Sequence, residues 1–282
     1  MREQFTWNLP RTAIPLGERT AVMGILNVTP DSFSDGGMYF DRQAAIARAK
    51  QIEEEGADII DVGGESTRPG SEEISEEEEL RRVLPVIEAL ASVVKIPISI
   101  DTYRFSVARR AIEAGAQIVN DISGFRFDTG MARVVNDGRA GVVLMHSRGR
   151  RDSLHTQSRM ADPIREVAEG LSASVAEARR AGISGNAIVI DPGIGFGKAA
   201  DESLRVLKSL NVFSKLGYPL LVGTSRKSFI RRLTAEASAE AINWGTAATI
   251  VAAIMGGAHI VRVHDVRHSR ALANMTDQII LA

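Results

Sequence analysis

Short runs of consecutive apolar residues recur along the chain, separated by longer stretches in which apolar residues return every three or four positions. A run of consecutive apolar residues is typical of a parallel β-strand buried on both faces, whereas a half-exposed strand alternates apolar and polar residues. Eight such runs follow residue 20, and they lie at 21–26, 59–62, 96–100, 117–119, 142–145, 187–190, 220–222 and 259–263.

The stretches between these runs have the period of amphipathic helices. Ile46, Ala49 and Ile52 share one face of the first stretch, and a last helical pattern covers 267–280. Strands that alternate with helices in this way predict an α/β fold, a (β/α)8 TIM barrel, which takes roughly 250 residues as a single domain. A doubly wound open sheet is the alternative, but its common strand orders have only about five or six strands.

The segment before the first strand has a different pattern. Residues 5–19 contain Pro10, Pro15 and Gly17 and lack a helical period, so we expect a short hairpin that closes the bottom of the barrel. No low-complexity linker or internal repeat interrupts the sequence. We therefore predict a single domain over 1–282, in which 1–20 form an N-terminal cap and 21–282 form the barrel.

A run of glutamates at 76–79 follows Ser75 at the expected start of a helix. A serine in that place caps the helix, and acidic residues in the first turn interact favourably with the helix dipole. We therefore interpret the run as a solvated helix face and not as a metal site. Pro85 lies further along the same pattern and predicts either a kink or the true start of the helix.

Composition narrows the possible functions. Among 282 residues, 34 are Lys or Arg and 35 are Asp or Glu, so the formal net charge of −1 provides no overall field that attracts nucleic acid or an anionic membrane. The sequence has no cysteine, which excludes disulfides, thiolate nucleophiles and cysteine-based zinc sites.

Targeting and membrane signals are also missing from the sequence. Residues 1–20 contain no apolar segment typical of a signal peptide, and the most apolar late stretch, 247–255, is far shorter than the roughly 20 residues of a membrane span. We expect a cytoplasmic protein that acts on small molecules and has neither a nucleic-acid nor a membrane partner.

Polar residues stand at the end of every predicted strand. Barrel active sites are built at the carboxyl ends of the strands, so these residues should meet in one cavity. Carboxylates, amides and cations are mixed among them, which favours a site that both recognises a polar ligand and neutralises an anion. The residues are Asn27, Asp61, Asp101, Asn120, Asp121, His146, Asp191, the group 225–228 and the group 262–265.

Two loops after strands are long for connections that usually take about 2–6 residues. They cover 27–37 and 63–70 and are rich in Gly, Ser and Thr, yet they also carry Phe33 and Arg68. We interpret them as lids that close over a reaction, with plain surface turns as the alternative.

Anion binding is the next chemistry that the strand ends indicate. The segment 223–228 opens a helical pattern, so its amides and hydroxyls could hold an anion at a helix N-terminus, although a simple N-cap is equally consistent with them. Arg262 and His264 lie two residues apart and therefore on the same side of the last strand. Together with Arg68 they could neutralise a phosphate or a diphosphate.

Metal and histidine chemistry is less clearly indicated. Asn27 could help to hold a hydrated Mg²⁺, which takes few protein ligands and keeps most of its waters. His146 has no evident second ligand, so we interpret it as a structural histidine, and His155 and His268 as surface residues.

The motifs, taken in their linear order, resemble those of the dihydropteroate synthase family. They are MGILNVTPDSFSDGG at 23–37, DVGGESTRPG at 61–70, SIDT at 99–102, VNDI at 119–122, LMH at 144–146, DPGIGFGK at 191–198, SRKS at 225–228 and RVHDV at 262–266. They span nearly the whole chain. One departure is Ser147, where the family often has Met near the pterin pocket.

The resemblance implies a (β/α)8 barrel that acts in folate biosynthesis. It implies that p-aminobenzoate is joined to 6-hydroxymethyl-7,8-dihydropterin diphosphate, with release of dihydropteroate and diphosphate and with help from Mg²⁺. Because the electron-rich pterin can delocalise a methylene cation, an SN1-like route is favoured. The amine of p-aminobenzoate is a weak nucleophile, so activation of the leaving group matters more than a strong base.

The same resemblance assigns roles to residues of this sequence, and Asp35, Arg68, Asp101 and Lys227 are the expected catalytic group. Carboxylates suit the N–H donors of a pterin edge, and charge-assisted bonds suit a diphosphate. The expected groups are Asp101, Asn120, Asp191, Phe196 and Lys227 for the pterin; Thr67, Arg262 and His264 for the diphosphate; Phe33, Pro69 and Ser228 for p-aminobenzoate; and Asn27 for Mg²⁺.

The family also implies a homodimer formed through the last helices, and competition by sulfonamides, which resemble p-aminobenzoate. Two other functions remain as alternatives at this point. One is a folate-dependent methyltransferase on the same barrel, which would need neither long lids nor a diphosphate clamp. The other is a homologue that binds pterin without turnover.

Overall fold

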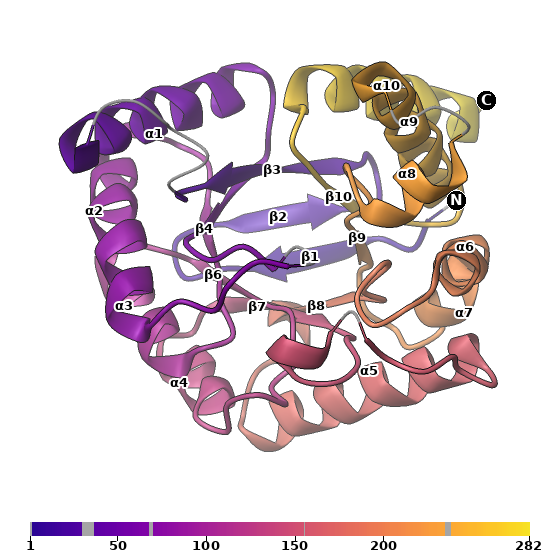
Figure 1. Cartoon of the computed structure of the whole chain (residues 1–282), viewed down its shortest axis with the longest axis horizontal. Coiled ribbons are helices and arrows are strands. Elements are labelled where there is room, and N and C mark those ends of the chain that lie inside the picture. The colour runs from indigo at the N-terminus through magenta and orange to yellow at the C-terminus, as the bar shows by residue number, and fades with distance from the viewer. Residues whose placement is uncertain (1, 30–36, 68–69, 155, 235–237) are drawn as a thin grey trace.

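In the computed structural model, residues 2–29, 37–67, 70–154, 156–234 and 238–282 are described. Within them, eight parallel strands pair in the order β8-β7-β6-β5-β4-β3-β10-β9. A parallel bridge between Ile190 and Leu220 joins the two ends of this order and closes the ring. Helices surround the ring on its outside (Figure 1). The predicted barrel is therefore confirmed, and the open doubly wound sheet is wrong.

The strands lie where the apolar runs predict them, and several continue further toward their carboxyl ends. Asp101, Asp121 and Asp191 are each the last residue of a strand and not the first residue of a loop. Their side chains are thereby held on the rigid sheet. The strands of the ring are β3 Ala21–Asn27, β4 Ile59–Gly63, β5 Ile98–Asp101, β6 Ile118–Asp121, β7 Gly141–Met145, β8 Ile188–Asp191, β9 Leu221–Val222 and β10 Ile260–Val263.

The helices depart from a strict alternation at two places. A second helix follows the first after β8 and again after β9, which the helical period of the sequence does not distinguish from one interrupted helix. The helices are α1 Gly37–Glu54, α2 Glu76–Val93, α3 Phe105–Ala114, α4 Met131–Asp137, α5 Pro163–Arg180, α6 Ala200–Lys208, α7 Leu210–Ser214, α8 Ser228–Leu233, α9 Ala239–Met255 and α10 Val266–Leu281, with short 3₁₀ turns η2 Arg151–Ser153 and η3 Gly185–Ala187.

The predicted N-terminal hairpin is present and covers the amino ends of strands of the barrel, where it contacts Gly141 and Ala187. β1 Phe5–Asn8 pairs antiparallel with β2 Ala13–Leu16. Trp7 is completely buried, and its Nε1 donates to the Ala187 carbonyl at 2.9 Å. Trp7 and Leu16 share an apolar cluster with inward-facing strand residues such as Met23, Ile59, Ile118 and Val143. The hairpin thus covers an apolar layer that would otherwise meet water.

The start of α2 agrees with the expected cap, but one glutamate behaves differently. The Oγ of Ser75 accepts from the Glu78 amide at 3.2 Å. Glu79 is only 1% exposed and forms an ion pair with Arg104, so the solvated face predicted for this run is wrong at Glu79. Its burial follows from the turn of the helix, which directs this position toward the loop after β5 and not toward solvent.

Pro85 does not mark the start of α2, because the helix runs without interruption from Glu76 to Val93. A proline inside a helix removes one backbone hydrogen bond and crowds the preceding turn. Val83, Ile87 and Leu90 of the same helix are completely buried, so apolar packing on both sides of the proline offsets that loss.

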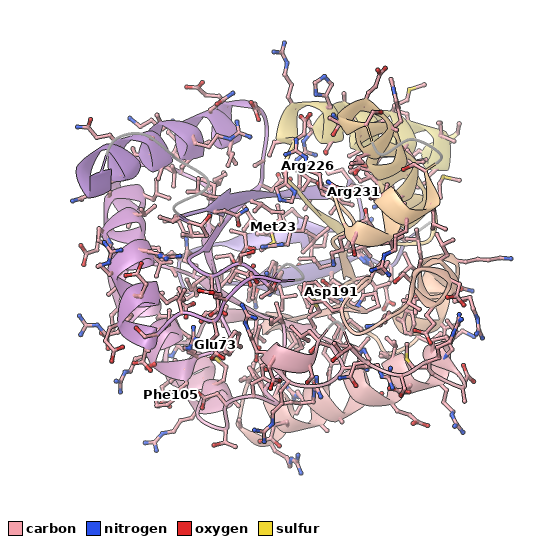
Figure 2. The ribbon with its side chains drawn as sticks, in the orientation of Figure 1. Met23, Glu73, Phe105, Asp191, Arg226 and Arg231 are labelled. Carbon is pink, nitrogen blue, oxygen red and sulfur yellow. The ribbon has the colours of Figure 1, made fainter. Side chains whose placement is uncertain are left out.

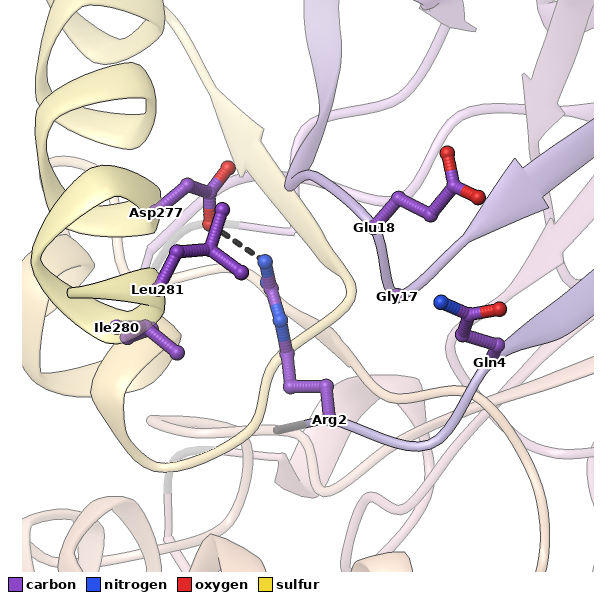
Figure 3. A pocket seen from close by; sticks show the side chains of 7 residues that line it. All are labelled: Arg2, Gln4, Gly17, Glu18, Asp277, Ile280 and Leu281. Atoms are coloured by element: carbon purple, nitrogen blue, oxygen red, sulfur yellow. Dashed lines mark hydrogen bonds and ion pairs between the residues drawn. The ribbon is translucent and has the colours of Figure 1, made fainter.

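A buried ion pair ties the N-terminal segment to the last helix (Figure 3). Arg2 Nη2 lies 2.5 Å from Asp277 Oδ1, and the two side chains are 6% and 5% exposed. Asp277 also accepts from the amide and hydroxyl of Thr20 at 2.6 and 2.8 Å, and Arg2 donates to the Ala258 carbonyl at 2.7 Å. Arg2 and Asp277 border a small pocket of about 50 Å³ beside α10.

We expect Asp277→Asn to lower the free energy of unfolding by about 3 kcal/mol, because it leaves the buried Arg2 guanidinium without its anion. Urea titration followed by circular dichroism measures this change. Glu177→Gln is the matched control, since Glu177 pairs with Arg180 on an exposed helix face, and it should change the free energy by less than about 0.5 kcal/mol. Equal effects of the two substitutions would show that the Arg2 pair contributes no specific stability.

Candidate functional site

The carboxyl ends of neighbouring strands bring several predicted polar residues into contact. Arg262 on β10 donates through Nε to Asp61 Oδ2 at 2.6 Å and through Nη2 to Asp101 Oδ2 at 2.5 Å. Asn120 on β6 donates through Nδ2 to the same Asp61 oxygen at 3.1 Å. Figure 2 shows Asp191, at the end of β8, inside the ring of helices. One connected polar group therefore lies across β10, β4, β5 and β6.

Asp61 is the centre of this group, although the sequence indicated it only as one more strand end. Its side chain is completely buried, and it accepts hydrogen bonds from Arg262 and Asn120 through one oxygen. Its other oxygen, Oδ1, is buried and has no hydrogen-bond partner among the described residues. The carboxylates of Asp61 and Asp101 outweigh the effect of burial on Arg262 and raise its pKa, so this guanidinium stays charged.

Asp101 is poised to titrate near neutrality. Burial raises its pKa to about 7, the Arg262 guanidinium opposes that rise, and the nearby Asp61 carboxylate adds to it. A carboxyl group with a pKa near the working pH can accept or donate a hydrogen bond as its ligand requires. This behaviour suits recognition of a heterocycle that carries both donors and acceptors.

Lys227 and Asp191 form the other side of the site. Lys227 Nζ donates to the Ile194 carbonyl and lies 4.1 Å from the centre of the Phe196 ring, a cation–π contact. Burial lowers the pKa of Lys227 to about 7, and the Asp191 carboxylate opposes this shift. Burial raises the pKa of Asp191, although Lys227 and the Gly193 amide, which donates to Asp191 at 2.7 Å, favour its ionised form.

The loop after β8 is held from below by a lysine that the sequence analysis did not single out. Lys198 Nζ contacts His146 Nδ1 at 3.0 Å and donates to the carbonyls of His146, Gly193 and Phe196 at 3.1, 2.8 and 3.1 Å. Gly193 has φ +63°, and a Cβ there would lie 1.8 Å from the His146 carbonyl oxygen, so only glycine fits. In a sequence, a lysine after a glycine-rich stretch suggests anion binding. The pattern therefore does not reveal that Lys198 instead bonds to carbonyls of its own loop.

His146 has the structural role expected of it. Burial and the neighbouring Lys198 lower the pKa of His146 to about 2, so the imidazole is neutral at physiological pH. Ser147, the departure from the family pattern, is buried and accepts from Arg126 Nη2 through its carbonyl and hydroxyl oxygens at 2.5 and 3.0 Å. It thereby anchors Arg126, a residue that no motif or period of the sequence indicated.

A serine orients the histidine of the last strand. Ser225 Oγ lies 3.0 Å from His264 Nδ1 and accepts from the His264 amide at 3.3 Å. In the same loop, Arg226 has φ 57°, and its amide donates to Thr246 Oγ1 on α9 at 3.2 Å. α8 begins at Ser228, so the helix start predicted for this segment is confirmed. Ser228 itself is exposed.

Some of the remaining predicted residues have a described position, and the others lie outside the described residues. Asn27 ends β3 and is half-buried, as is Thr67 in the loop after β4. His268 is exposed, as expected. Across the described ranges, no three His, Asp or Glu side chains come together as a metal site. Phe33, Asp35, Arg68, Pro69 and His155 lie outside the described residues.

Comparison with known proteins gives the family. The sequence profile of the pterin-binding enzymes matches residues 23–264. The chain is 46% identical to the dihydropteroate synthase of Synechocystis over 269 residues, which cover 95% of this chain and 93% of that protein. The chain belongs to the dihydropteroate synthase family. Its activity is that of a dihydropteroate synthase, a transferase of folate biosynthesis, as the motifs predict, and the methyltransferase alternative is not supported.

Solved structures of this family agree over the whole chain. The dihydropteroate synthase of Xanthomonas albilineans with 4-aminobenzoic acid is 40% identical and superposes with a TM-score of 0.91, covering 99% of both chains. The Yersinia pestis dihydropteroate synthase with a sulfonamide drug is 35% identical and has a TM-score of 0.90, covering 98% of this chain and 99% of that one. In the part of this chain that the structure describes, no helix is both long and apolar enough to cross a membrane.

We expect the stability of the protein to report the titration of Asp101. Its pKa of about 7 in the fold lies above the usual 3.8, so burial favours the protonated form. The stabilisation linked to that proton is complete below pH 3.8 and is lost as the pH rises through 7. Between pH 5 and pH 8, the wild type should therefore lose free energy of unfolding relative to Asp101→Asn, as measured by urea titration at each pH.

Asp137→Asn is the control for this titration, because Asp137 is exposed at the end of α4 and forms an ion pair with the exposed Arg133. The difference between wild type and Asp137→Asn should be the same at pH 5 and pH 8. If Asp101→Asn behaves like this control, Asp101 does not titrate near neutrality.

Proposed function

We propose that the strand-end group binds 6-hydroxymethyl-7,8-dihydropterin diphosphate and p-aminobenzoate and joins them. In this reaction the bond between the pterin methylene carbon and the diphosphate oxygen breaks, and a bond forms from that carbon to the amine nitrogen. The amine loses one proton, and diphosphate leaves. The observation that carries this proposal is the joint placement of Asp101, Asn120, Asp191 and Lys227 at the ends of β5, β6, β8 and the loop after β9.

The pterin is expected to lie between these four side chains. Carboxylates of Asp101 and Asp191 accept from the amino and ring N–H groups, and Asn120 can both donate and accept. Lys227 donates to the carbonyl side of the ring, and Phe196 forms part of the wall beside it. The raised pKa of both carboxyl groups and the lowered pKa of Lys227 follow from burial, so ligand contacts replace the missing solvation.

The leaving diphosphate needs cationic partners, and Arg262 is the best placed of the described residues. Its guanidinium has five N–H donors, more than the contacts with Asp61 and Asp101 use. His264, held by Ser225, and Thr67 complete the proposed diphosphate group. Stabilising the developing charge on the diphosphate favours the SN1-like route, because the carbon–oxygen bond then breaks before the weak amine attacks.

Mg²⁺ fits this site only in company with the substrate. Asn27 offers a single amide oxygen, and the described residues provide no cluster of three ligating side chains. A Cβ built on Gly63 would lie 3.8 Å from Asn27 Oδ1 and 3.6 Å from Asp101 Cβ, so this oxygen lies on the Asp101 side of the strand ends. One protein oxygen, diphosphate oxygens and waters are a usual Mg²⁺ environment. The ion would neutralise charge on the diphosphate.

The p-aminobenzoate is proposed to lie between Phe33, Pro69 and Ser228, with Asp35 and Arg68 ordering the site around the cationic intermediate. The exposed position of Ser228 at the start of α8 supports its part in this assignment. The other four residues rest on the family motifs. Because sulfonamides resemble p-aminobenzoate, and the Yersinia pestis relative binds one, we propose that they compete at this site.

We also propose that the chain works as a homodimer through its last helices. Among the described residues, all large apolar side chains that are more than half exposed lie on α8, α9 and α10. These helices lie together at one side of the barrel (Figure 1). A gathered exposed apolar surface indicates an interface. The residues are Leu233, Trp244, Met255, Met275, Ile279 and Leu281.

We also propose a cytoplasmic location and a single functional domain. A single functional domain over 1–282 is supported by the buried contacts of Arg2 and Thr20 with Asp277, which join the cap segment to the last helix.

The activity assay measures diphosphate release and dihydropteroate formation with and without p-aminobenzoate and Mg²⁺. We expect equal amounts of both products, and only when p-aminobenzoate and Mg²⁺ are present. Asp191→Asn should lower kcat/KM for the pterin substrate on the order of 100-fold, because the substituted amide presents a donor where an acceptor is required. Asp201→Asn, at an exposed ion pair with Arg159, is the control and should leave kcat/KM unchanged.

Binding without turnover would favour the homologue that lacks catalysis. An unchanged kcat/KM in Asp191→Asn would remove Asp191 from the pterin site. Turnover that persists after chelation of Mg²⁺ would remove the metal from the proposal.

We expect Trp244→Asp to convert the dimer to a monomer at micromolar concentration, because a carboxylate replaces the most exposed apolar side chain of the surface on α8–α10. Sedimentation velocity measures the oligomeric state. Val93→Asp at the end of α2 introduces the same charge at an exposed apolar position away from these helices and should remain dimeric. A wild-type chain that sediments as a monomer would contradict the proposed interface.

A further inference from the structure

A group of charged side chains joins three loops beside the candidate site. Glu65, in the loop after β4, is 4% exposed and accepts from Arg104 Nη1 and Arg151 Nε, each at 2.7 Å. Arg104, in the loop after β5, also pairs with Glu79 at the start of α2. The Tyr103 hydroxyl donates to Glu65 Oε2 at 3.1 Å. We refer to Glu65, Glu79, Tyr103, Arg104 and Arg151 as the Glu65 cluster.

The two arginines of the Glu65 cluster do different things. Arg104 binds the base of the loop after β4, since besides its carboxylate partners it donates to the Ile74 carbonyl at 2.7 Å, just before α2. Arg151 comes from the 3₁₀ turn η2, in the loop after β7, and its side chain contacts the second half of the loop after β4 at Ser71. Arg151 is therefore the contact that joins this loop to a different side of the barrel.

Arg151 bonds to the loop after β4 on both sides of its narrowest part, which we call the neck and which is formed by Ser66 on one side and Ser71 and Glu72 on the other. It donates to the carbonyl of Ser66 at 3.0 Å, to the carbonyl and hydroxyl of Ser71 at 3.0 and 3.1 Å, and to the carbonyl of Glu72 at 3.0 Å. The Ser71 hydroxyl donates to the Ser66 carbonyl at 2.5 Å, so the two sides of the neck already touch. With the Glu65 contact, one guanidinium bonds to both sides of the neck.

We propose that Arg151 is a positioning residue that sets the place of the loop after β4, and with it of Thr67, relative to the strand-end group. Thr67 directly follows Ser66, the residue that Arg151 holds on one side of the neck. The proposal rests on the proposed part of Thr67 in diphosphate binding. It adds a residue from the loop after β7 to those on which the reaction depends, although Arg151 itself need not touch substrate.

The chemistry of the side chain explains why an arginine stands at this point. A planar guanidinium presents several N–H donors in a fixed fork, and it can serve a carboxylate and several carbonyls at once. A lysine offers one compact ammonium group and cannot reach both sides of the neck in the same geometry. The Arg151 side chain is only 14% exposed, so its bonds compete little with water.

Arg151→Met tests the proposal, since methionine keeps an unbranched apolar stem without the donors. Arg151→Lys keeps the charge, and Arg150→Met removes the same charge from the exposed neighbouring residue as the matched control. We expect Arg151→Met to weaken binding of the pterin diphosphate about ten-fold and to lower kcat/KM by a similar factor, because a misplaced group loses transition-state contacts. Arg151→Lys should recover little of this loss.

Binding of 6-hydroxymethylpterin, which lacks the diphosphate, separates positioning from general damage. Its calorimetric Kd should be the same in Arg151→Met, Arg150→Met and the wild type, because the proposed pterin residues lie on the strands and in the loops after β8 and β9, and not on the loop after β4. Equal weakening of both ligands by Arg151→Met would mean a general loss of structure and would overturn the proposal. Equal behaviour of Arg151→Met and Arg150→Met would overturn it as well.

Hydrogen exchange tests the same proposal without reference to the reaction. In the ligand-free protein, amides of 65–67 and 70–75 should exchange faster in Arg151→Met than in the wild type or Arg150→Met, and amides of the strands should not change. Unchanged exchange in these two segments would show that Arg151 does not hold this loop. If the wild type neither binds nor converts pterin diphosphate, the proposed function fails, while this exchange measurement still decides the role of Arg151.

Discussion

A closed parallel barrel forces the carboxyl ends of all its strands into one small area, and in this chain several of those ends are carboxylates. Asp61, Asp101, Asp121 and Asp191 end their strands or lie within them close together; Asp61, Asp121 and Asp191 are buried, and the Asp101 side chain is 22% exposed. A buried carboxylate without a partner is strongly unfavourable. The guanidinium of Arg262, which bridges Asp61 and Asp101, is the interaction that makes this arrangement possible.

The electrostatics of the site follow from this crowding. Burial raises the pKa of the Asp101 carboxyl group to about 7 and lowers the pKa of the Lys227 ammonium group to about 7. The two groups therefore have similar pKa values near neutral pH. Such groups change charge easily when a ligand brings its own donors and acceptors. A polar heterocycle can then be bound on the rigid strand ends with little movement of the backbone, which is the arrangement expected of a preorganised site.

The loops around this base depend on a different principle. The loop after β8 is held by the buried ammonium of Lys198 on three carbonyls and His146, and the loop after β4 is held by the guanidinia of Arg104 and Arg151. Lys198 bonds to three main-chain carbonyls, Arg151 bonds to three of the loop after β4, and Arg104 bonds to one more at Ile74. In the proposed function, the fixed strand ends bind the pterin and the cation-held loops complete the site around the part that reacts.

The sequence by itself determined the barrel architecture and the polar residues at the strand ends, several of which the structure brings into contact. Several local signals identified their elements: the consecutive apolar runs, the helical periods, the Ser75 cap and the polar strand ends. Each signal depends on residues close together in the sequence, because a strand buried on both faces and a helix buried on one face each leave a pattern within a few residues. Tertiary structure alone decided which charges meet. Asp61 and Arg262 are 201 positions apart, and Glu65 and Arg151 are 86 apart, and no periodicity records such pairs. The burial of Glu79, the central place of Asp61 and the use of Lys198 depend on which loops the closed barrel brings together, and that closure is a property of the whole chain.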